Sequence, residues 1–256
     1  MVYTRTRDQI EGIRVAAQLV ARTLEELGRR VRPGVTTAEL DQLAETIIRD
    51  HGARPAFKGY RGFPASICPS VNEEVVHGIP GPRILREGEI VGIDVGVEKD
   101  GWYGDAARTF AVGDVSDEAT RLLKVTSEAL DLGVAQARAG NRVGDISHAV
   151  QSHVEAQGFS IVRALVGHGI GREMHEEPAV PNFGPPGRGP RLMAGTVLAI
   201  EPMVNVGGAE VVTRPDGWTV ATKDGRLSAH FEHTVAVGPD GPEVLSVLPA
   251  GQESKR

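Results

Sequence analysis

The chain of 256 residues is 40% hydrophobic and 24% charged, which is ordinary for a globular protein long enough to bury a sizeable core without disulfide staples. Its formal net charge of -6 argues against nucleic acid as a stable partner, because phosphate binding needs clusters of basic residues. The single cysteine, Cys68, excludes an internal disulfide and favours a reducing compartment.

The N-terminus is expected to carry no targeting segment. Charged residues follow Met1 within a few positions, so the apolar stretch of a signal peptide is missing. No window of the sequence approaches the ~20 apolar residues that span a membrane. We therefore expect a soluble protein of the cytoplasm that has no membrane partner.

Apolar residues at helical spacing predict four helices in chain order. They cover about residues 7–29, 37–51, 116–138 and 144–157. Thr37 and Ser116 are the expected N-caps of the second and third helices, since a hydroxyl oxygen can accept the first free N–H groups. Strand-like runs lie at 89–97, 102–112, 195–204 and 230–237, and the segment 178–191, rich in Pro and Gly, is expected to be a loop.

The order of these elements repeats once along the chain. Positions around Gly34 recur around Gly140, and a series of apolar positions around Asp94 recurs around Glu201, at a nearly constant offset. We interpret this as one α+β domain, residues 1–256, with two pseudo-symmetric helix-helix-hairpin halves, about 7–113 and 114–248, around an antiparallel sheet. A chance match of apolar positions is the alternative. The repeat places Asp94 and Glu201 at equivalent points, where symmetry could bring the carboxylates together.

Four acidic residues lie within the predicted strands: Asp94, Asp105, Glu201 and Glu232. A hairpin turn is expected near Asp100-Gly101, and a turn centred on 99–100 sets Asp94 directly opposite Asp105, with Cβ atoms roughly 5 Å apart. Carboxylates at that distance raise each other's pKa unless a cation lies between them. Solvated acids on an exposed hairpin are the alternative for this pair alone. Because the pattern recurs at Glu201 and Glu232, a shared metal centre is the simpler explanation.

His168 is the natural nitrogen donor for such a centre. It stands in Val166-Gly-His-Gly-Ile-Gly, where the glycines let backbone approach a bound ion or substrate. Their spacing matches neither a dinucleotide fingerprint nor a phosphate-binding loop. One imidazole with four carboxylates suits Mn, Fe(II), Co or Zn, and five ligands suit two ions roughly 3.5–4 Å apart. A structural histidine in a glycine-rich loop is the alternative for His168 alone.

Several segments, taken in order, resemble type I methionine aminopeptidases over about residues 7–248. They are Ser70-Val-Asn-Glu-Glu-Val-Val-His-Gly-Ile-Pro, Ile93-Asp-Val, Gly104-Asp, Gly167-His-Gly-Ile-Gly, Met174-His-Glu-Glu-Pro, Ile200-Glu-Pro-Met-Val-Asn and Phe231-Glu-His-Thr. The resemblance implies the pita-bread fold and a metalloaminopeptidase that removes the initiator methionine from nascent proteins when the second residue is small. It also implies a hydroxide activated by two divalent ions, which would be Co, Mn, Fe(II) or Zn.

The same resemblance implies the roles of individual residues. The metal ligands would be Asp94, Asp105, His168, Glu201 and Glu232, with Asp105 and Glu232 bridging both ions. His77 and His175 would contact the substrate and the developing tetrahedral intermediate, and Glu201 would also carry protons. The methionine pocket would use Phe57, Tyr60, Phe63, Cys68 and Trp218, where plain core residues are the alternative, and the match is looser at Phe57, Phe63, Met174 and His230. Relatives imply a monomer with a transient ribosome contact.

Three other functions are alternatives to this interpretation. An Xaa-Pro aminopeptidase or prolidase shares the metal set but carries a preceding N-terminal domain, and only about 90 residues precede Asp94 here. A type II methionine aminopeptidase has a helical insert in its second half, and no such insert is visible in this sequence. A non-catalytic pita-bread protein that binds peptides loses metal ligands, whereas all five positions are filled here.

Overall fold

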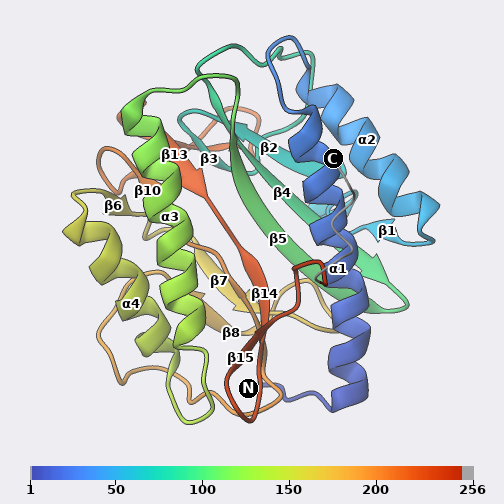
Figure 1. Ribbon diagram of the computed structural model, residues 1–256, viewed down its shortest axis with the longest axis vertical. Helices are drawn as coiled ribbons and strands as arrows, with labels where there is room; N and C mark the ends of the chain where they lie inside the picture. The colour runs from blue at the N-terminus through green and yellow to red at the C-terminus, as the bar shows by residue number, and fades with distance from the viewer. Residues whose placement is uncertain (1, 250–256) are drawn as a thin grey trace.

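The computed structural model describes residues 2–249, and Figure 1 shows helices lying over the strands. In chain order the α-helices are α1 (Arg7–Arg30), α2 (Thr37–Asp50), α3 (Asp117–Ala135) and α4 (Val143–Ala156). The four predicted helices are confirmed to within a few residues at each end. Among the described residues, no helix combines the length and apolar character needed to cross a membrane.

The residue that caps α2 differs from the expected one. Thr36, not Thr37, accepts the N–H of Glu39, and the Glu39 carboxylate accepts the N–H of Thr36 in return at 2.7 Å. This reciprocal capping box satisfies two N–H groups near the start of the helix. Thr37 is instead the first helical residue, and its hydroxyl donates to the carbonyl oxygen of Gly81. Ser116 caps α3 as predicted.

The strands pair antiparallel in several small sheets. In chain order they are β1 (Arg54–Pro55), β2 (Ile67–Val71), β3 (Glu74–Val76), β4 (Ile90–Lys99), β5 (Trp102–Ala111), β6 (Ser160–Ile161), β7 (Val166–Gly169), β8 (Glu176–Pro181), β9 (Val197–Ile200), β10 (Met203–Asn205), β11 (Val211–Thr213), β12 (Val220–Thr222), β13 (Ser228–His230), β14 (His233–Val237) and β15 (Pro242–Val244). The main sheets have the orders β1-β4-β2, with β5 paired to β4, and β15-β14-β9-β7-β8. Smaller sheets join β13, β10 and β6, and β11, β12 and β3. The α+β class is confirmed.

Two predicted strands are broken where acidic residues lie. The run 195–204 divides into β9 and β10 at Glu201-Pro202, since proline has no N–H for the ladder. The run 230–237 divides into β13 and β14 around Glu232. β9 pairs with the distant β14, whereas β4 and β5 form a tight hairpin. The first part of 178–191, predicted as a loop, belongs to β8.

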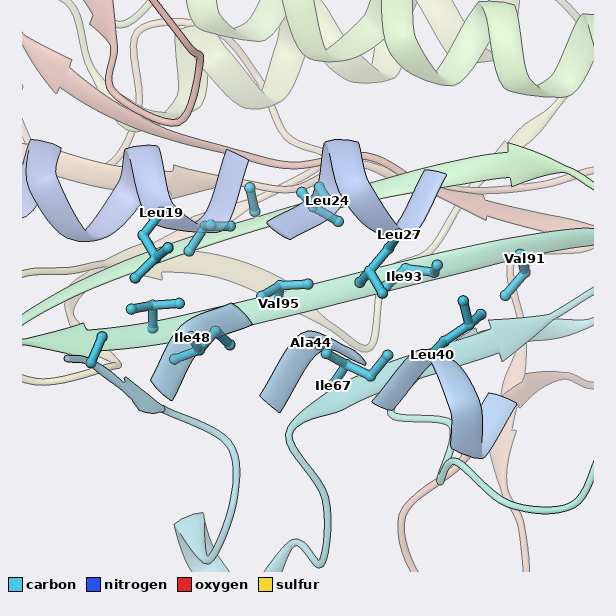
Figure 2. Packing of buried hydrophobic residues seen from close by; sticks show 14 of the residues in the cluster. Leu19, Leu24, Leu27, Leu40, Ala44, Ile48, Ile67, Val91, Ile93 and Val95 are labelled. Carbon is cyan, nitrogen blue, oxygen red and sulfur yellow. The ribbon is translucent and has the colours of Figure 1, made fainter. Parts of the chain in front are cut away.

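Apolar side chains of α1 and α2 pack against β4 to form one hydrophobic core (Figure 2). Leu27, Ile48 and Ile93, one from each of these elements, are fully buried. Burial of one such side chain contributes roughly 1.5–3 kcal/mol. A second cluster packs α3 and α4 against β10 and β13 and includes the fully buried Leu122 and Val150. The strands that contribute to these clusters are therefore held rigidly in place, together with the functional side chains that they carry.

The part of the chain before α3 meets the part after it where β5 runs beside β14 (Figure 1). The N–H of Glu232 donates to the carbonyl oxygen of Ala107 at 2.9 Å. The hydroxyl of Thr234 accepts the N–H of Asp105 at 3.0 Å and donates to the carbonyl oxygen of the same residue at 2.7 Å. These long-range contacts bring Asp105 and Glu232 together.

Candidate metal centre

The four acidic residues and His168 converge on one cavity of about 160 Å³. Asp94 and Asp105 come from the β4–β5 hairpin and His168 from β7, whereas Glu201 and Glu232 lie at the two breaks between strands. Ligand atoms of Asp105, His168 and Glu232 lie within 4.8 Å of one another, and all three residues are buried. The structure thus brings together all five residues that were predicted from the sequence as metal ligands.

The pairing of Asp94 with Asp105 differs from the prediction. Asp94 lies opposite Ala107, and Asp105 lies opposite Gly96. The reason is the turn, whose two central residues are Asp100 and Gly101, both with positive φ, rather than residues 99–100. Asp94 and Asp105 are therefore diagonal neighbours on the same face of the hairpin and not directly opposed. Their side chains still point into the same cavity.

Burial makes these carboxyl groups reluctant to ionise without a cation. It raises the pKa of Asp94 to about 7, although a hydrogen bond with Asp105 opposes the shift. Burial, followed by repulsion from neighbouring carboxylates, also raises the pKa values of Asp105, Glu201 and Glu232. Asp94 Oδ1, Asp105 Oδ1 and Glu232 Oε1 are buried without a hydrogen-bond partner. Buried oxygens of this kind fit the ligand set of hard or borderline divalent ions.

The tautomer of His168 suits a metal ligand. Its Nδ1 donates to the carbonyl oxygen of Gly169 at 2.9 Å, which leaves the lone pair on Nε2. Nε2 lies 3.5 Å from Glu201 Oε1 and 3.8 Å from Asp105 Oδ2. Burial lowers the pKa of His168 to about 4, so the ring is neutral near pH 7. A neutral imidazole with its free nitrogen facing carboxylates is the arrangement that an ion would complete.

The close packing of neighbouring strands explains why glycines lie on both sides of His168, which the sequence alone did not show. A Cβ at Gly167 would collide with the carbonyl oxygen of Ala199 in β9, and one at Gly169 with that of Glu177 in β8. β7 lies between these two strands. The glycines therefore allow the neighbouring backbones to approach His168 on both sides.

The two other predicted histidines line the same cavity. Nδ1 of His175 is hydrogen-bonded to the Tyr60 hydroxyl at 3.0 Å, and the His175 ring lies 4.2 Å from the ring of His168. Although His175 is partly exposed to solvent, its desolvated position beside the cavity lowers its pKa, with further contributions from His168 and Arg61. His77 adopts a positive φ of 60°, and burial lowers its pKa as well. Both rings are thus neutral and close to the proposed metal ligands.

The residues predicted for the methionine pocket, together with Arg61, which was not predicted, form the rest of the cavity wall. The predicted residues are Phe57, Tyr60, Phe63, Cys68 and Trp218. Phe63 and Trp218 meet edge to face, with centroids 5.2 Å apart. Met174 packs against this group from behind. The cavity therefore has an aromatic end and a carboxylate end.

One residue beside the carboxylates has no role that the sequence predicts. His230 is buried, and its Nε2 lies 3.8 Å from Glu201 Oε2 and 4.0 Å from Glu232 Oε2. The alternation of side chains along a strand could have indicated this position. Residues two apart in an extended segment share a face, and His230 precedes Glu232 by two. That indication was weak, since the strand breaks between them.

The whole chain is similar to proteins of one known family. The sequence pattern of metallopeptidase family M24 matches residues 11–239. A methionine aminopeptidase from Clostridium perfringens is 55% identical over 248 residues, which cover 97% of this chain and 100% of that protein. The crystal structure of methionine aminopeptidase from Rickettsia prowazekii is 44% identical with a TM-score of 0.95, and the match covers 96% of this chain and 100% of that one.

The fold is also similar to that of a larger enzyme. An Xaa-Pro dipeptidase from Bacillus anthracis matches 96% of this chain with a TM-score of 0.78 at 24% identity. This match covers 62% of the dipeptidase. The match therefore covers nearly the full length of both chains for the methionine aminopeptidases, but only part of the chain of this dipeptidase.

Proposed function

The chain belongs to metallopeptidase family M24, among the methionine aminopeptidases, and we propose that it removes the first methionine of new proteins by means of two divalent metal ions. The observation that carries the proposal is a set of buried, unpartnered carboxylate oxygens that share one cavity with a neutral imidazole and an aromatic wall. The pita-bread fold, which the chain shares with the solved methionine aminopeptidases, supports the same reaction.

We assign five residues to the ions: Asp94, Asp105, His168, Glu201 and Glu232. Asp105 and Glu232, which hydrogen bonds across β5 and β14 hold close together, would be the ligands shared by both ions. Four carboxylates with one imidazole suit Mn, Fe(II), Co or Zn. When bound, such ions lower the pKa of water from 15.7 to about 7 and polarise a carbonyl group.

Side chains around the cavity supply proton transfer and orientation. Glu201 lies beside His168 and is placed to accept a proton from the attacking water and return it to the leaving amine. His77 and His175, both neutral, can donate hydrogen bonds to the substrate carbonyl oxygen as its negative charge grows. Because Nδ1 of His175 is bonded to Tyr60, its Nε2 remains for the substrate.

The aromatic end of the cavity suits the methionine side chain. An unbranched thioether can enter a narrow space and contact aromatic edges through its sulfur. The carboxylates that line the cavity, among the described residues, are the four assigned to the ions, so a basic first residue would lack its own partner. His77 and His175 flank the expected position of the scissile bond, and we expect them to admit only a small second residue.

A panel of short peptides tests this proposal. With added Mn, Co, Fe(II) or Zn, peptides beginning Met-Ala, Met-Gly or Met-Ser should be cleaved, and those with Leu, Lys or Arg second should be cleaved very poorly. Equal rates for Met-Ala, Lys-Ala and Glu-Ala peptides would indicate a general aminopeptidase. Cleavage of Ala-Pro but not Met-Ala peptides would favour the Xaa-Pro function, and no cleavage with any metal would favour a binding protein.

We place the reaction on nascent chains in the cytoplasm, with the protein acting as a monomer that contacts the ribosome transiently. The support is similarity to bacterial methionine aminopeptidases over their full length. Sedimentation of the protein alone and with ribosomes tests the monomer and the contact separately.

A further inference from the structure

His230 is a buried imidazole whose side chain has no hydrogen-bond partner among the described residues. It lies at the end of β13 and is 3% exposed. Its Nε2 is enclosed and faces two carboxylates, Glu201 Oε2 at 3.8 Å and Glu232 Oε2 at 4.0 Å. A buried donor without a partner is costly, so this nitrogen needs an explanation.

The backbone of His230 is firmly held. Its N–H donates to Thr109 Oγ1 at 3.0 Å, and its carbonyl oxygen accepts the hydroxyl of Thr109 at 2.8 Å. The same residue pairs with Met203 across β13 and β10. These contacts fix the backbone from which the ring extends toward the carboxylates.

Two roles are compatible with this position: a further metal ligand, or a donor to a carboxylate that binds the metal. A ligand histidine almost always donates its other N–H to a protein acceptor, which fixes the tautomer. His168 has that feature, because its Nδ1 donates to Gly169. Among the described residues, the hydrogen bonds of His230 other than strand pairing are those of its backbone with Thr109, so its Nδ1 has no such acceptor. With an N–H on Nε2, by contrast, the ring presents a donor to the carboxylates that it faces.

Glu201 lies between the two imidazoles. Its Oε1 lies 3.5 Å from His168 Nε2, and its Oε2 lies 3.8 Å from His230 Nε2. We propose that His230 is a positioning residue that donates its Nε2–H to Glu201 Oε2 and so directs Oε1 toward the ion that His168 binds. The nitrogen and oxygen need only approach by about 1 Å to reach hydrogen-bond distance. The inference rests on the proposed metal centre and adds a residue that orients one of its ligands.

Substitution by alanine and by glutamine tests the role of His230. Glutamine carries an amide N–H that can donate, but it is a poor ligand for these ions. In His230→Ala, we expect the dissociation constant for Mn or Co, measured by calorimetry without substrate, to rise about 10–100-fold. Turnover of a Met-Ala peptide should fall mainly in kcat, with KM little changed. His230→Gln should recover most of the metal affinity and most of kcat.

Two further variants complete the design. His233→Gln is the matched control, because His233 is a half-buried histidine of the same segment whose Nδ1 is bonded to Ser246. It should bind metal like the wild type. His168→Gln removes a proposed ligand and should weaken metal binding and change the visible spectrum of the Co(II)-loaded protein.

The outcomes separate the proposal from its competitors. Unchanged metal affinity and kcat in His230→Ala would refute it. If His230→Gln weakens binding and changes the Co(II) spectrum as His168→Gln does, His230 is a ligand and the positioning role is wrong. Metal affinity is measured without peptide, so its dependence on residue 230 stands even if the wild type cleaves no methionine peptide. That result would refute the proposed function alone.

Discussion

The hydroxyl of Tyr60 lies 3.0 Å from Nδ1 of His175, and the two rings stack with centroids 5.3 Å apart. Tyr60 begins a short 3-10 helix (Tyr60–Gly62), whereas His175 lies just before β8. The contact therefore joins two segments that are distant in the chain and that both line the cavity. It also determines which nitrogen of His175 is available to a substrate.

Replacing His175 by alanine should lower kcat by about 10²–10³-fold, or roughly 2.7–4 kcal/mol, if the ring donates to the developing oxyanion. Tyr60→Phe keeps the ring and loses one hydrogen bond, so its effect should be near 1 kcal/mol, about fivefold. Steady-state kinetics and metal analysis of each variant give the answer. Loss of bound metal in His175→Ala would make His175 a ligand and contradict the assignment.

Strong chelation should abolish turnover, and Mn, Co or Fe(II) should restore it. The ions should also raise the melting temperature, because they relieve repulsion among buried carboxylates and bind only the folded chain. At a free metal concentration about 100 times Kd the gain is about 2.7 kcal/mol. Calorimetric scans across a metal titration measure it. Full activity in a sample shown to be free of metal would exclude the proposed mechanism.

Glu232→Ala should abolish turnover, since it removes a proposed bridging ligand. The metal-free variant should nevertheless be at least as resistant to unfolding as the metal-free wild type, because one buried, repelling carboxylate is gone. Denaturant unfolding of both metal-free proteins tests this. A large loss of stability would mean that Glu232 supports the fold independently of any ion.

Gly96→Ala should impair methionine binding. Its Cβ would lie 2.6 Å from Phe57 Cε1 and 2.9 Å from Met174 Cε, so both side chains must shift at the aromatic end of the cavity. Such overpacking costs typically 1–3 kcal/mol, and we expect KM for a Met-Ala peptide to rise several-fold. Gly81→Ala is the control, since its Cβ would meet no atom within 4 Å. Unchanged KM in Gly96→Ala would show that the first side chain binds elsewhere.

Arg5→Ala should loosen the segment that carries His175. Glu176 accepts the N–H of Arg172 at 2.7 Å and that of Glu173 at 3.1 Å, and its second oxygen pairs with the Arg5 guanidinium. Loss of this charged bond should cost about 1.5–3 kcal/mol and lower kcat. Thermal unfolding and kinetics measure both effects. Arg7→Ala, at an exposed position, is the control, and equal behaviour of the two variants would contradict the role of Arg5.

Local chemistry was enough to predict much of this protein from its sequence. Periodicity located the helices, and the hydroxyl of Ser116 marked the start of α3 correctly. The acidic residues stood out because a carboxylate in an apolar run is costly without a cation. These patterns depend only on residues that are close together in the chain, so they can be recognised without a structure.

Only the tertiary structure decided how these residues meet. The position of the turn between β4 and β5 makes Asp94 and Asp105 diagonal neighbours. A shift of the turn by one residue would change every pairing of the hairpin. Glu232 reaches the centre through a hydrogen bond to Ala107, and His230 faces Glu201 because Thr109 holds its backbone. Such contacts join segments far apart in the chain, and their geometry follows from packing of the whole core rather than from any local pattern.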